Sequence, residues 1–206
     1  MAKDREQTEG RILDAAFATL AEDGLTGFGI NAVARRAGCD KKLIYRYFDG
    51  PDGLLVAMGR ASGQEMAVAL EDVLDPPPAD YADLVGVLTT ALANHLATDS
   101  HAREAARVAL AAPDAAAAPF RAARAAVLRD WFQQAKTKLG VVAPDGTDAA
   151  VVNAVLIAGV EALAVAGSYA GVTLSDAGDR ARVAAALRRL AAGAYPPRLP
   201  QGGGGA

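Results

Sequence analysis

Residues 30–48, INAVARRAGCDKKLIYRYF, constrain the fold more strongly than any other stretch of this sequence. The apolar residues of its first half recur at helical spacing, which predicts a short helix with one apolar face. These residues are Ile30, Val33, Ala34 and Ala37. Gly38 tolerates the positive φ at which helices commonly end, and Asp40 is a favourable N-cap for a second helix over 41–48. The stretch therefore predicts two short helices joined by a tight turn.

The other faces of this helix pair are cationic and aromatic. Residues 31–48 carry a net charge of +4, whereas the whole chain carries −3. An acidic protein can still bind DNA through one local cationic patch. Lys and Arg can donate to guanine, and Leu43 can contact a thymine methyl group. The candidate DNA contacts on the pair are Asn31, Arg35, Lys41, Lys42, Leu43 and Arg46. A basic, solvated face on an ordinary helix pair is the alternative.

The helix pair and the sequence on both sides of it contain short motifs that are typical of a known family. In chain order these are RILDAA at 11–16, Gly24, VARRAG at 33–38, LIYRYF at 43–48 and PDGLL at 51–55. From about Thr8 to Met58 the sequence resembles the N-terminal DNA-binding domain of the tetracycline-repressor (TetR) family of bacterial transcription regulators. The resemblance implies that Tyr45 and Tyr47 contact DNA phosphates. A supporting position in the core is the alternative for Tyr45.

Four positions depart from the family pattern. Phe28-Gly29 replaces the usual Thr or Ser before the first helix of the pair, and Asp40 replaces a Ser N-cap. Lys42 stands where a small residue is usual, and Pro51 removes a common lysine at the start of the next helix. Asp and Gly are acceptable caps and Pro suits a first helical position, so the helix starts survive. The departures bear on affinity and operator sequence rather than on the fold.

The remaining chain is rich in Ala and Leu, poor in aromatic residues and without strand alternation, which predicts an all-α protein. We expect an N-terminal three-helix helix-turn-helix domain at 1–50, a larger helical ligand-binding and dimerisation domain at 51–195, and a disordered Pro- and Gly-rich tail at 196–206. Besides the pair, helices are expected at about 8–22, 51–74, 81–97, 101–111, 120–139, 148–169 and 175–194. The longest apolar stretch, 151–170, contains Asn153 and Glu161, which favours a buried helix over a membrane span.

The resemblance implies two further features of the second domain. The eighth and ninth helices are expected to meet a symmetry mate in a four-helix bundle, with an intrachain core as the alternative. A cavity among the fifth to eighth helices is expected to hold a small effector, and the abundant Ala, Val and Leu favour a largely apolar one. The candidate lining residues are Tyr81, His95, His101, Trp131, Phe132, Asn153, Glu161 and Tyr169.

Other classes of protein find little support. The sequence contains no nucleophile motif, phosphate-binding loop or zinc-protease motif, so we assign no catalytic residue and no cofactor. His95 and His101 are six apart, which is unsuited to a shared metal, and we expect no metal site. Cys39 is the only cysteine and the N-terminus is polar, both in keeping with a cytoplasmic protein and no membrane.

The predicted function is a homodimeric, ligand-responsive DNA-binding regulator, most simply a repressor, acting on a palindromic double-stranded operator. An α-helical module that holds an acidic protein on its basic helix is the main alternative, and an enzyme without a recognisable motif is a more remote one. A preference for one palindromic duplex over scrambled DNA separates the first two, because both kinds of binding weaken with salt.

Overall fold

The computed structural model describes residues 2–110 and 115–196, and these fold into helices without a named strand. An isolated bridge pairs Tyr169 with Val172. The fold is therefore all-α, as predicted. The helices are α1 (Ala2–Gly27), α2 (Ile30–Ala37), α3 (Lys41–Phe48), α4 (Pro51–Glu71), α5 (Tyr81–Thr98), α6 (Ser100–Leu110), α7 (Ala118–Leu139), α8 (Ala149–Ala166) and α9 (Ala177–Ala194), with a 3-10 turn at Ala115–Ala117.

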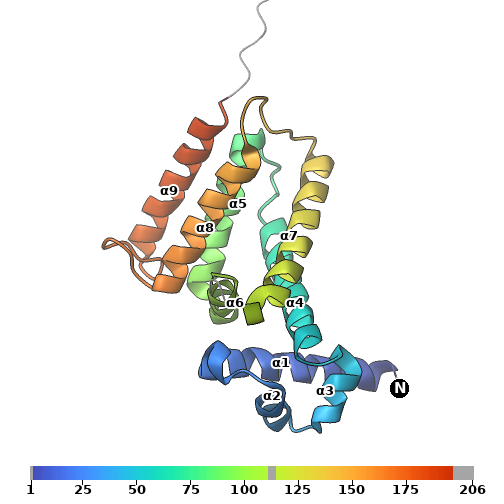
Figure 1. The fold of residues 1–206 in the computed structure, drawn as a ribbon. Coiled ribbons are helices and arrows are strands. Elements are labelled where there is room, and N and C mark those ends of the chain that lie inside the picture. The colour runs from blue at the N-terminus through green and yellow to red at the C-terminus, as the bar shows by residue number, and fades with distance from the viewer. Residues whose placement is uncertain (1, 111–114, 197–206) are drawn as a thin grey trace, which may run out of the picture.

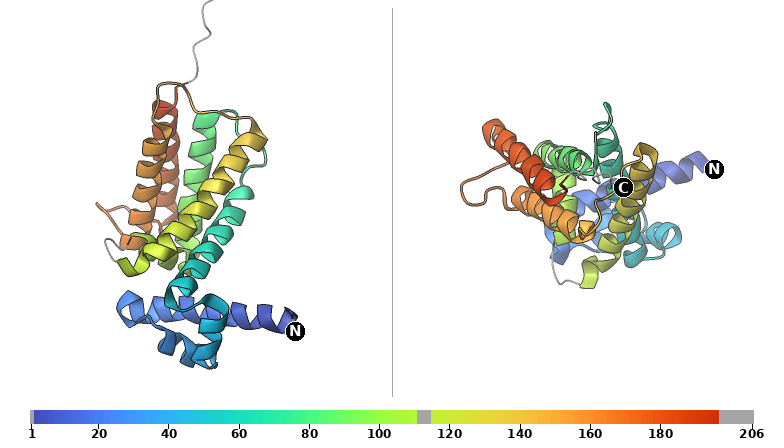
Figure 2. Two further views of the ribbon diagram at one scale, coloured as in Figure 1. Left: turned by 45° about the vertical axis from the view of Figure 1, so that its right-hand side comes forward. Right: turned by 90° about the horizontal axis from the view of Figure 1, so that it is seen from above.

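The helices form two layers of different size, a small layer of α1 to α3 and a larger bundle of α4 to α9 (Figures 1 and 2). Helices α1, α2 and α3 lie across one end of an upright bundle built from α4 to α9. Helix α4 rises from the small layer and packs along α7, while α5 packs against α8 and α9. Glycines allow the close crossing of α4 and α7, because a Cβ at Gly59 would lie 2.3 Å from the carbonyl oxygen of Phe120.

Aspartates begin four helices of the bundle. Asp80, Asp99, Asp148 and Asp176 each accept a hydrogen bond from a backbone N–H in the first turn of the helix that follows, over 2.8–3.1 Å. These bonds satisfy donors that a helix cannot pair internally. Asp99 in this way caps the start of α6.

One apolar cluster joins the small layer to the bundle. Ile12 of α1, Val33 of α2 and Ile44 of α3 are fully buried together with Leu54 of α4 and Phe120 of α7. Residues of α6 belong to the same cluster. A second cluster fills the bundle and includes Leu84, Leu96, Val160 and Leu187. The small layer is therefore seated on the bundle by shared side chains and not only by the chain connection at α4.

A polar clasp closes the opposite end of the bundle. Asn153 of α8 donates to the hydroxyl of Tyr81 over 2.9 Å, and the hydroxyl of Tyr195 donates to Asn153 Oδ1 over 2.8 Å. The two tyrosine rings meet edge to face, with centroids 4.9 Å apart. Burial raises the pKa of Tyr195 to about 12, so its hydroxyl keeps its proton at neutral pH. The clasp joins α5, α8 and the residue that follows α9.

Helix α8 differs from the buried helix that the sequence predicted. By length and composition it is apolar enough to cross a membrane, yet only 17% of it is buried within the described chain. Val151, Val155 and Ile157 are exposed. Asn153 and Glu161 point instead to partners inside the bundle. The predicted burial of this helix is therefore not met within one protomer, and the intrachain core given as the alternative to a dimer does not account for α8.

Three predicted boundaries of helices and segments are also corrected. Helix α1 begins at Ala2 and not near Thr8, and it is interrupted at Gly24, where φ is 64°. Helix α8 ends at Ala166, which leaves Tyr169 in the connection to α9. In the predicted tail, Pro196 is described, whereas residues 197–206 lie outside the described residues.

Candidate DNA-binding surface

The turn between α2 and α3 has the geometry that its sequence predicts. Gly38 adopts φ 62°, and the backbone N–H groups of Gly38 and Cys39 donate to carbonyls in the last turn of α2. Asp40 accepts from the N–H of Lys42 over 2.8 Å and so caps α3. Glycine makes the left-handed turn without steric cost. These local bonds fix the angle between the two helices.

Apolar contacts hold the pair on α1. Val33 and Ile44 are fully buried, and Leu43 and Phe48 pack against the same cluster while staying partly exposed. Leu43 is predicted to contact a thymine methyl group. Part of its side chain packs against the core, and the rest is exposed to solvent. Because one face of each helix is buried, the opposite faces have fixed directions.

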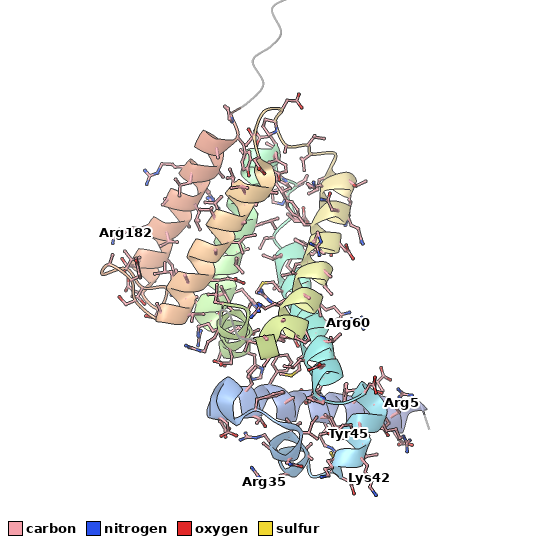
Figure 3. All side chains as sticks on the ribbon, in the orientation of Figure 1. Arg5, Arg35, Lys42, Tyr45, Arg60 and Arg182 are labelled. Atoms are coloured by element: carbon pink, nitrogen blue, oxygen red, sulfur yellow. The ribbon has the colours of Figure 1, made fainter. Side chains whose placement is uncertain are left out.

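Those opposite faces carry most of the predicted DNA contacts. Figure 3 shows Arg35 and Lys42 at the edge of the molecule that lies farthest from the bundle. Tyr45 is 54% exposed, so it lies on the surface and not in the core. The exposed candidates are Asn31, Arg35, Lys41, Lys42, Tyr45 and Arg46. Tyr47 is half-buried beside them.

The charges of this surface are mostly uncompensated. Among the described residues, Arg35, Lys41, Lys42 and Arg46 have no acidic partner. Arg36 is different, because it donates two hydrogen bonds to the carboxylate of Glu22 on α1, over 2.7 and 2.5 Å. These bonds lower the pKa of Glu22 and tie α2 to α1. Four free cations on two short helices form a surface suited to the phosphates of a duplex.

A family model matches the N-terminal helices. The profile of bacterial regulatory proteins of the tetR family matches residues 12–58, which span the second half of α1, the helix pair and the start of α4. The N-terminal helices of the chain therefore match the DNA-binding domain of the TetR family. The resemblance stated from the sequence is confirmed.

Two curated relatives align with parts of this chain. The HTH-type transcriptional regulator Rv1255c of Mycobacterium tuberculosis is 35% identical over 79 residues, which cover 36% of this chain and 39% of the relative. The HTH-type transcriptional repressor SCO4008 of Streptomyces coelicolor is 30% identical over 96 residues, or 47% of this chain and 46% of the relative. The alignments thus span less than half the length of these relatives.

Solved structures match over nearly the whole chain. A protein of Mesorhizobium loti described as a TetR-family transcriptional regulator has a TM-score of 0.64 at 18% identity, covering 93% of this chain and 98% of its own. FadR of Bacillus subtilis, solved with stearoyl-CoA, has a TM-score of 0.61 at 16% identity, covering 88% and 96%. At such low identities the similarity concerns the fold alone, and it covers the bundle as well as the N-terminal helices.

The predicted ligand-lining residues do not share one place in this fold. Tyr81, Phe132 and Asn153 lie together at the clasp. His95 and His101 flank a shallow hollow where α5 meets α6, at the other end of α5.

The remaining three candidates are also scattered. Trp131 packs partly buried against the bundle core. Glu161 is buried in an ion pair with Arg124 of α7. Tyr169 is 73% exposed in the connection between α8 and α9. The eight candidates therefore fall into several separate sites.

A second hollow opens beside the clasp. It has a volume of about 380 Å³ and lies between the start of α5, the loop after α7 and the residues that follow α9. Its lining residues are Asp80, Tyr81, Ala82, Gly140, Val142, Pro144, Tyr195 and Pro196. Tyr81 is the only predicted candidate among them. Sequence reasoning missed Tyr195, because nothing local distinguishes a tyrosine at the end of a helix from a surface residue.

Proposed function

We propose that this chain is a ligand-responsive transcriptional regulator of the TetR family, and specifically a repressor that binds a palindromic operator as a homodimer. The observation that carries the proposal is the exposed face of α2 and α3, which carries four unpaired cations. Two of them, Arg35 and Lys42, lie at the edge of the molecule farthest from the bundle (Figure 3). An α-helix fits the major groove, where Lys and Arg donate to guanine and neighbouring groups contact phosphates. The repressor SCO4008, a partial relative, supports the direction of regulation.

The exposed face of α8 supports the homodimer. Val151 and Val155 are one helical turn apart and more than half exposed, and Leu190 of α9 is 57% exposed. Small residues follow the valines along α8 at Ala158 and Ala162, both exposed. Exposed apolar residues gathered on one helix in this way mark an interaction surface, and small residues let a second helix approach closely. We propose that α8 and α9 meet the same helices of a second copy, which would present two α3 helices to two half-sites.

The effector is proposed to be a small, largely apolar molecule that releases the operator. The bundle core that α5 to α8 enclose is built mainly of Leu, Val and Ala. Bacillus subtilis FadR, which shares this fold, was solved in complex with stearoyl-CoA, a ligand with a long apolar part. The hollow of about 380 Å³ beside Tyr81 is within the size range of small-molecule sites, and we propose it as a first place to test. A regulator of this kind acts in the cytoplasm, where the DNA is.

The DNA-binding proposal is tested with two alanine variants and a matched control. Lys42→Ala and Arg46→Ala are each expected to weaken binding of the duplex that the parent protein selects, about five- to hundredfold, because each removes a contact of roughly 1–3 kcal/mol. Arg182→Ala removes one cation from α9, where Arg182 pairs with Asp179 far from α3, and should bind like the parent. Gel-shift titration measures all four proteins.

Circular dichroism and size-exclusion chromatography should show the same fold and assembly for the four proteins. If Lys42→Ala and Arg46→Ala both bind as tightly as Arg182→Ala, the assigned face is not the DNA-binding face. In that case the proposed function loses the observation that carries it.

A further inference from the structure

Arg5 lies close to the recognition surface although the sequence gave it no role. Helix α1 begins at Ala2, so Arg5 is held in a helix and not in a loose end. Its guanidinium carbon lies 5.4 Å from the ring centroid of Tyr47 on α3. Figure 3 shows Arg5 near the N-terminal end of α1, on the side of the molecule where α3 lies. The first turns of α1 thus belong to the same surface as α3.

Two arginine side chains lie against the ring of Tyr47. The guanidinium carbon of Arg46 lies 5.2 Å from the same ring centroid, so two cations share one aromatic ring. Cation–π attraction holds each of them against the ring. Two cations held at one ring both attract a phosphate anion that approaches this part of the surface.

The donors of this cluster remain available. Arg5 uses Nε to donate to Glu9 over 2.6 Å, which leaves its two terminal nitrogens without a partner among the described residues. Arg46 and the hydroxyl of Tyr47 have no hydrogen-bond partner within the described part of the chain. A guanidinium offers five N–H donors in a planar fork that suits the oxygens of a phosphate.

We infer that Arg5, Tyr47 and Arg46 form a clamp for one phosphate of the DNA backbone. The inference rests on the proposed function and adds a contact made by α1. Lys41 and Lys42 lie at the start of α3, whereas the clamp lies beside its last turn. The clamp would therefore bind the DNA backbone strand that flanks the major groove. A phosphate contact of this kind adds affinity and fixes orientation but does not depend on base sequence.

The clamp is tested on the intact protein by salt dependence. The probe is a fluorescein-labelled duplex of mixed sequence about three helical turns long, and binding is measured by fluorescence anisotropy across a sodium chloride series. The slope of log affinity against log salt reports the number of phosphates neutralised, at about 0.9 per contact. Arg5→Ala is expected to reduce the slope by about one unit for each bound protomer and to weaken binding several-fold.

Two variants separate the clamp from other effects. Arg11→Ala removes one exposed cation from another face of α1 and should change the slope by less than half as much. Glu9→Gln breaks the pair with Arg5 but leaves Arg5 in place, so it should keep the slope of the parent protein. If Glu9→Gln reproduces Arg5→Ala, Arg5 acts through helix stability and the clamp is wrong.

The outcomes also distinguish the clamp from the function on which it rests. If the parent protein binds the duplex and Arg5→Ala has the same slope as Arg11→Ala, the clamp is overturned and DNA binding stands. If the parent protein fails to bind both this duplex and a randomised pool, the proposed function and the clamp are both overturned.

Discussion

Glu161→Ala is expected to lower the free energy of unfolding by about 3–5 kcal/mol, because it leaves the guanidinium of Arg124 buried without a counter-charge. Arg124 Nη2 donates to Glu161 Oε1 over 2.9 Å, and both side chains are only 8% exposed. Within the described chain, Arg124 Nε has no hydrogen-bond partner. The pair joins α7 to α8, so its loss should loosen the bundle beneath the proposed dimer face.

Urea denaturation at one fixed protomer concentration measures the loss, since dimerisation would otherwise shift the apparent stability. The matched control is Glu71→Ala, which breaks the exposed pair between Glu71 and Lys138 and should cost less than about 1 kcal/mol. The double variant Arg124→Met with Glu161→Leu removes both charges and should be more stable than Glu161→Ala alone. If Glu161→Ala and Glu71→Ala have equal free energies of unfolding, the buried ion pair contributes no more to stability than the exposed one.

Val155→Glu is expected to convert the protein from a dimer to a monomer at micromolar concentration. Val155 is 66% exposed in one protomer and lies on the apolar stripe of α8. In the proposed dimer, the new carboxylate would be buried opposite its own symmetry mate, without a partner. A penalty of about 4 kcal/mol or more corresponds to at least a thousandfold rise in the dissociation constant.

Sedimentation equilibrium gives the molecular mass directly. Val68→Glu is a close control, because Val68 is 65% exposed but lies on α4, away from α8 and α9. This variant should remain dimeric. The monomeric Val155→Glu should also bind the operator more weakly, since two linked half-sites bind with a higher effective concentration than one. A dimeric Val155→Glu, or a monomeric parent, would place the interface elsewhere or remove it.

The local features of the N-terminal helices were predictable because their causes are local. Gly38 and Asp40 fix the turn through bonds within a few residues, and the apolar spacing of Val33, Ala34 and Ala37 fixes the buried face. The cap at Asp99 is predictable for the same reason. The exposed positions of Lys42 and Arg46 follow once that buried face is known.

Contacts between distant segments could not be predicted in this way. Arg124 and Glu161 are 37 residues apart, and only the fold brings them together. Arg5 sits in a charged segment without an apolar stripe, so hydrophobic periodicity gave no reason to extend α1 to Ala2. Its contact with Tyr47 depends on the placement of α1 against α3.

Helix α8 shows a different limit of the sequence. An apolar helix looks the same whether it is buried by its own chain, by a second copy or by lipid. The structure separates these cases in part, because Asn153 and Glu161 bond inside the bundle while Val151 and Val155 face outward. Sequence alone predicted the apolar character of α8 but left open whether its own chain or a second copy buries it.

The most direct test of the central claim is selection of bound sequences from a pool of random duplexes. The protein presents one cationic α3 per protomer, and a two-fold dimer presents two. We therefore expect an enriched, symmetric consensus with two half-sites about one helical turn apart or a multiple of that spacing. A pool that stays random, or binding that is equal for the recovered duplex and its scrambled version, would contradict it.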